Sequence, residues 1–64
     1  MINEQIKALD GLPLDQFKEE AAKLGFRTRV IEEDGEHFVV TCDYDINRVN
    51  VAVNGGIVTV KGIG

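Results

Sequence analysis

The segment that most constrains the fold is residues 48–53, in which every second residue is a valine. Val49, Val51 and Val53 alternate with Arg48, Asn50 and Ala52. Because successive side chains of a β-strand point to opposite faces, this pattern predicts a central strand with one apolar face. Asn54-Gly55-Gly56 then predicts a tight hairpin turn, with residues 57–61 as the partner strand.

One helix is predicted over residues 14–24, between the break at Gly11-Leu12-Pro13 and Gly25, which is typical of a helix C-terminus. Its apolar stripe consists of Leu14, Phe17, Ala21 and Leu24. We expect this stripe to be core and not a partner groove, because a domain this small needs every apolar face that it has. Residues 1–11 are expected to form either a short helix or an N-terminal arm.

Between the helix and the central strand, one further strand is expected and a second one stays open. Residues 26–31 alternate as a strand does, and Asp34-Gly35 predicts a turn after them. Residues 37–40 fit either another short strand or the start of an exposed segment. The whole chain, residues 1–64, is thus expected to be one α+β domain. One helix packs on a mixed or antiparallel sheet of three to four strands, and an extended exposed loop precedes the central strand.

The net charge, the apolar runs and the cysteine count argue against several classes of function. The net charge of −4 argues against nucleic-acid binding, which needs a basic surface. No apolar run reaches the roughly 18 residues of a membrane span, and no signal peptide is present, so we expect no membrane partner. The sequence as given indicates a cytoplasmic protein, or a secreted or periplasmic one if a leader has been removed. Cys42 is the only cysteine, which leaves an intermolecular disulfide as the only possible one.

The residues that could carry chemistry do not form a catalytic pattern. Cys42 and His37 would lie on opposite faces of a regular strand, and no second motif holds either of them. Asp43 and Asp45 would share a strand face without a pocket around them. One histidine with scattered acids is weak evidence for a metal site. We therefore expect a protein that is not an enzyme, with no metal and no cofactor.

Acidic residues gather in a stretch that contains no lysine or arginine. They are Glu32, Glu33, Asp34, Glu36, Asp43 and Asp45. Such a stretch is either a solvated rim or a face that attracts a basic partner.

Two neighbouring motifs resemble a known family. Val40-Thr41-Cys42-Asp43-Tyr44 is followed by Asn47-Arg48-Val49-Asn50-Val51, and an apolar residue precedes Gly64. This arrangement is similar to the potato inhibitor I family of serine-protease inhibitors, of the eglin and barley chymotrypsin-inhibitor type. It is closer still to the bacterial relatives of that family, which carry a similar Thr-x-Asp-Tyr and Arg-x-Asn arrangement. With weaker likeness upstream, the resemblance covers roughly residues 9–64.

The resemblance implies an inhibitory loop that enters a protease cleft as a substrate-like strand. The loop residues it implies are Val40, Thr41, Cys42, Asp43, Tyr44 and Asp45, with the scissile bond between Cys42 and Asp43. It assigns Arg48, Asn50 and Gly64 to supporting the loop, with Asn50 where the family usually has a second arginine. The strand alternation independently turns Arg48 and Asn50 away from the valine face.

The leading expectation is therefore a reversible inhibitor of a subtilisin-like or chymotrypsin-like serine protease. We expect a monomer, and a dimer stays open. Two alternatives also stay open. The segment of residues 30–41 is longer than in the family, so residues 38–42 could be the second strand of a hairpin. The chain could also be a non-inhibitory protein-binding module that uses the acidic surface of residues 32–45.

Overall fold

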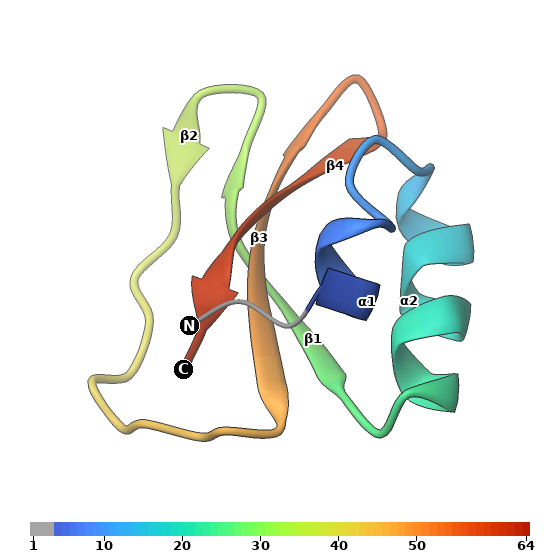
Figure 1. The fold of residues 1–64 in the computed structure, drawn as a ribbon. Helices are drawn as coiled ribbons and strands as arrows, with labels where there is room; N and C mark the ends of the chain where they lie inside the picture. Colours follow the sequence, from blue (N-terminus) through green and yellow to red (C-terminus); the bar gives the residue numbers. More distant parts are fainter. Residues whose placement is uncertain (1–3) are drawn as a thin grey trace.

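The computed structural model describes residues 4–64, which form two helices and one four-stranded sheet. The elements are α1 (Glu4–Lys7), α2 (Leu14–Lys23), β1 (Arg27–Glu33), β2 (Glu36–His37), β3 (Arg48–Asn54) and β4 (Ile57–Ile63). Both helices lie on the same side of the sheet (Figure 1). The strand order is β2-β1-β3-β4; β1 pairs parallel to β3, and the other two pairings are antiparallel. The expected α+β fold, with one main helix on a mixed sheet, is confirmed.

Helix α2 begins directly after Pro13, whose fixed φ suits the entry to a helix. It ends before Gly25, which has φ +86°, a left-handed conformation that glycine adopts without a Cβ clash. Phe17 and Ala21 are buried, and Leu14 and Leu24 pack against them from the ends of the stripe. The helical stripe is core, as expected. In the N-terminal segment, α1 buries Ile6 against the same core.

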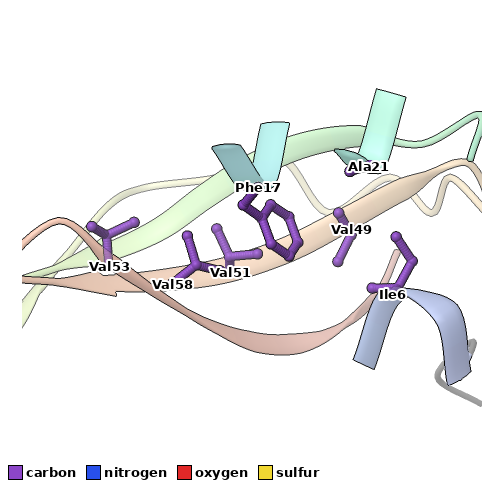
Figure 2. Packing of buried hydrophobic residues seen from close by; sticks show 7 residues of the cluster. All are labelled: Ile6, Phe17, Ala21, Val49, Val51, Val53 and Val58. Atoms are coloured by element: carbon purple, nitrogen blue, oxygen red, sulfur yellow. The ribbon is translucent and has the colours of Figure 1, made fainter. Parts of the chain in front are cut away.

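The core lies between the helices and the valine face of β3. Figure 2 shows Phe17 over Val51 and Val58, with Val53 at one end of the cluster and Ile6 and Val49 at the other. Full burial of each such side chain contributes about 1.5–3 kcal/mol to folding. Ala52 is buried too, although it lies on the opposite face of β3, so that face is not open to solvent along its whole length.

Strand β4 continues two residues beyond the predicted end at residue 61. The turn at Gly55 and Gly56, both with positive φ, starts the hairpin as the sequence predicts. A register shift between Asn50 and Val51 then places Gly62 opposite Asn50. The backbone N–H of Gly64 donates to the Arg48 carbonyl at 3.0 Å. The C-terminal residues are thereby fixed beside the first residues of β3.

The outer edge of β4 is covered by the segment that precedes α2. Val58 donates to the Leu12 carbonyl at 2.9 Å and accepts from the Gly11 N–H at 2.8 Å. One carboxylate oxygen of Asp10 accepts from the Val60 N–H at 2.6 Å. A free strand edge is a template for pairing with other chains, so this segment protects the sheet.

The opposite edge of the sheet is the two-residue strand β2. Asp34 and Gly35, both with positive φ, form the predicted turn between β1 and β2. Pairing stops at once: residues 38–45 form neither helix nor strand, and only the Phe38 N–H still donates to β1, at the Ile31 carbonyl. The alternative in which residues 38–42 form a strand is therefore wrong. Strand β1 itself runs on to Glu33, beyond its predicted end at residue 31.

Neither of the two described helices is long and apolar enough to span a membrane.

Candidate functional site: an exposed loop tied to three arginines

The β2–β3 loop (residues 38–47) extends away from the helices as a long irregular segment (Figure 1). All six residues predicted for the inhibitory loop lie within it: Val40, Thr41, Cys42, Asp43, Tyr44 and Asp45. Asp45 is half-buried, and the other five are exposed. Several large apolar side chains are also exposed here, with Val39 at 102%, Tyr44 at 72% and Ile46 at 64% of full accessibility. A loop this apolar and this exposed is a candidate for contact with a partner.

Arg48, the first residue of β3, holds the part of the loop that follows Cys42. Its Nη2 donates to the Asp43 carbonyl at 2.9 Å, and its Nη1 lies 3.4 Å from the Asp43 carboxylate. Its Nε donates to the Gly64 carbonyl oxygen at 2.8 Å. The Arg48 side chain is only 15% exposed, so these bonds are partly shielded from water. The sequence correctly placed Arg48 on the loop side of the strand.

Arg29 of β1 holds the part of the loop that precedes Cys42, and the sequence analysis did not identify it. Its Nη1 donates to the Thr41 carbonyl at 3.4 Å and to the Thr41 hydroxyl at 3.3 Å. Its Nε donates to the Asn50 side-chain oxygen at 2.7 Å. Local sequence patterns could not reveal this role, because Arg29 meets Asn50 only through the parallel pairing of β1 with β3.

Asn50 supports the loop only through other groups. Its amide nitrogen donates to the Gly64 carbonyl oxygen at 3.2 Å, and its amide oxygen accepts from Arg29. Among the hydrogen bonds of residues 4–64, none joins the Asn50 side chain directly to the β2–β3 loop. Its position fixes the guanidinium group of Arg29, which does reach the loop.

The carbonyl oxygen of Gly64 is the centre of this polar layer. It accepts from Arg29, Arg48 and Asn50 at 3.3, 2.8 and 3.2 Å. A Cβ added to Gly64 would lie 3.5 Å from both the Asn50 amide nitrogen and the Tyr44 ring, so Tyr44 packs directly over this residue. Gly64 therefore contacts the predicted supporting residues and also the loop.

A third arginine holds the end of the loop. Arg27 of β1 forms an ion pair with Asp45. Asp45 also accepts the Asn47 N–H at 2.8 Å on its carboxylate and the Arg48 N–H at 3.2 Å on its carbonyl. These bonds form the turn that leads into β3. Arg27 was not identified from the sequence either, because its partner Asp45 lies in a distant segment of the chain.

Asp43 is held as a carboxylate by its neighbours. Its pKa is lowered first by a hydrogen bond from the Thr41 hydroxyl, then by its own backbone N–H and by the nearby positive charge of Arg48. Polar contacts to the sheet therefore flank Cys42 on both sides, from Arg29 to Thr41 and from Arg48 to Asp43.

The residues considered for catalysis lie in different environments. The His37 ring nitrogen Nδ1 lies 3.4 Å from the Glu32 carboxylate, and Cys42 is a free, exposed thiol. No group of three His, Cys, Asp or Glu side chains within residues 4–64 is placed to hold a metal ion. Asp43 and Asp45 pair with arginines of the same chain, so they do not add free negative charge to the acidic stretch.

Comparison of the chain with protein-family models, with curated proteins and with solved structures found no match.

Proposed function

We propose that this protein is a reversible, substrate-like inhibitor of a serine protease of the subtilisin-like or chymotrypsin-like type. Residues 40–45 would enter the protease cleft as an extended strand, with Cys42 before the scissile bond and Asp43 after it. One observation carries the proposal. The Cys42–Asp43 peptide bond is exposed, while the residues on its two sides are hydrogen-bonded to two different arginines of the sheet.

This arrangement suits inhibition because it orders the loop before binding. Ordering a flexible side chain at an interface costs about 0.5–1.5 kcal/mol, and a loop that is already ordered avoids much of that cost. An extended segment then gains affinity from main-chain hydrogen bonds to the cleft and selectivity from side chains that enter pockets.

The same bonds would also slow the loss of a cleaved loop. If the protease hydrolysed the Cys42–Asp43 bond, Arg29 would still hold the Thr41 side and Arg48 the Asp43 side. The new amine would stay near the acyl group, which favours resynthesis of the bond over release. The likeness of the Thr41-Cys42-Asp43-Tyr44 and Arg48-x-Asn50 motifs to the potato inhibitor I family supports the same proposal.

Titration against subtilisin and chymotrypsin tests this function, with intact-mass analysis of the inhibitor over time. We expect stoichiometric loss of protease activity together with slow cleavage at the single bond after Cys42. Rapid cleavage would contradict inhibition and would indicate a substrate. Absence of both inhibition and cleavage would also contradict it.

An acidic protein-binding module is the second candidate, and the contacts favour it less. Within residues 32–45, Asp43 and Asp45 pair with Arg48 and Arg27, and Glu32 contacts His37. The acidic residues of this range outside such pairs are Glu33, Asp34 and Glu36 at the β1–β2 turn, and the Asp34 carboxylate accepts the Gly55 N–H at 2.8 Å. A partner bound by this surface would be released at raised salt, because exposed charges more than about 10 Å apart are screened at 0.1 M ionic strength.

A further inference from the structure

Side chains of the β2–β3 loop fall into two rows between residues 41 and 46. The inward row consists of Thr41, Asp43 and Asp45, each of which is bonded to an arginine of the sheet. The outward row consists of Cys42, Tyr44 and Ile46, which are exposed, although one edge of the Tyr44 ring also packs against Gly64. Over residues 41–45 this is the period-two alternation of an extended chain, and Ile46 lies in the turn that leads into β3. The bonds that hold the inward row therefore fix which side chains face a partner.

The outward row is small at Cys42 and large on the side that follows it. The Cys42 side chain has one heavy atom beyond Cβ, whereas Tyr44 two residues later is an exposed aromatic ring. Before Cys42, Val39 is the most exposed of the large hydrophobic side chains. Large apolar groups thus lie on both sides of the proposed scissile bond, and a small one lies next to it.

On the basis of the proposed function, we infer that the target is a serine protease with a small primary pocket, of the elastase type. We further infer that Cys42 decides which primary pocket fits, and that Val39 and Tyr44 contribute most of the side-chain binding energy. The thiol side chain would leave most of a chymotrypsin-type pocket unfilled, and it offers no cation to the acidic pocket of trypsin. Each methylene group that is missing from an apolar pocket weakens binding by about 10- to 200-fold.

Tyr44 is suited to dominate the contact on the side that follows the bond. Its ring packs against Gly64, so it is already positioned, while 72% of its surface remains accessible. Tyrosine is among the residue types that most often dominate protein–protein binding energy, because it buries a large area with few rotatable bonds. Val39 is fully exposed and has no such packing partner among residues 4–64, so it can follow the shape of an apolar subsite.

The test compares inhibition constants for pancreatic elastase, chymotrypsin and trypsin. For the unmodified protein we expect inhibition of elastase to be at least about 10-fold tighter than that of chymotrypsin. Cys42→Ala should keep this order, and Cys42→Phe should reverse it. Tyr44→Ala and Val39→Ala should each weaken elastase inhibition, by about 10- to 100-fold for Tyr44. Ile57→Thr, which changes an exposed apolar residue of β4 far along the chain from the loop, is the matched control and should change nothing.

The possible failures are distinguishable. Tighter inhibition of chymotrypsin or trypsin by the unmodified protein would overturn the small-pocket inference and leave the proposed function standing. Changes of less than about twofold for both Tyr44→Ala and Val39→Ala would overturn their role in binding. Inhibition of subtilisin alone would overturn this inference and leave the proposed function standing. If neither the unmodified protein nor Cys42→Phe inhibits subtilisin or any of the three proteases, the proposed function fails together with this inference.

Discussion

Arg29 and Arg48 divide the task of holding the loop. Arg29 bonds the residue before Cys42, and Arg48 bonds the residue after it. Both also donate to the carbonyl oxygen of Gly64. A guanidinium group suits this task because its five N–H donors lie in one rigid plane and can reach several acceptors at once. A lysine at either position would offer a point charge without that geometry.

Removing either arginine should loosen the loop more than the fold. We expect Arg29→Ala and Arg48→Ala each to accelerate subtilisin cleavage of the Cys42–Asp43 bond by about 10-fold or more. The free energy of unfolding should fall by only about 1–2 kcal/mol, since the lost bonds are partly exposed. Mass spectrometry of timed digests and urea unfolding measure the two effects, with Lys18→Ala on the exposed side of α2 as control. Cleavage no faster than in the control would show that the arginines do not hold the loop.

Asp43 should make the order of the loop depend on pH. Its folded pKa is lowered, so its contribution is fully present above the ordinary value of 3.8 and is lost as pH falls below that through the folded pKa. We expect the side-chain NMR resonance of Asp43 to titrate with a midpoint below 3.8. The Thr41 and Tyr44 amide resonances should move with it. Asp43→Asn should remove this transition, and a midpoint at or above the ordinary value would contradict the hydrogen bond from Thr41.

At the scale of secondary-structure elements, local patterns predicted what depends on local sequence. Helix α2, the β3–β4 hairpin and the Asp34-Gly35 turn each follow from residues close together in the chain. Register shifts cannot be predicted from such patterns. Strands β1 and β4 each continue past a register shift and end beyond the residues predicted from the sequence. The role of Arg29 depends on contact with Asn50, 21 residues away, through parallel pairing. Arg48 was identified from the resemblance to the potato inhibitor I family and from the strand alternation, both of which depend on local sequence.

The covered edge of β4 provides a test at the same scale. Asp10→Ala should leave the Val60 N–H without its acceptor and lower the free energy of unfolding by about 1 kcal/mol, the usual net value of such a bond. Urea unfolding measures this loss, and Glu19→Ala on the exposed side of α2 is the matched control. A difference within about 0.3 kcal/mol of the control would mean that water replaces the carboxylate without cost.

Across the whole molecule, the two faces of β3 have separate tasks. Val49, Val51 and Val53 pack under the helices, while Arg48 and Asn50 on the other face belong to the polar layer under the loop. Core and loop are therefore joined by one strand but depend on different interactions. With 64 residues the core is small, and a chain of this size buries only about 60% of its unfolded surface.

This separation predicts opposite outcomes for core and loop substitutions. Phe17 is fully buried at the centre of the cluster, so Phe17→Ala should cost about 3–5 kcal/mol. That loss is comparable with the whole stability of a small domain, typically about 5–15 kcal/mol, so much of the protein should unfold near 37 °C. The proposed inhibition should then fall in proportion to the folded fraction measured by circular dichroism, and it should recover on cooling toward 15 °C. Arg48→Ala should instead weaken the proposed inhibition while the folded fraction stays near one at both temperatures. If Phe17→Ala abolished inhibition in a sample that remained fully folded, the loop would depend on the core directly, and the two faces of β3 would not be separate.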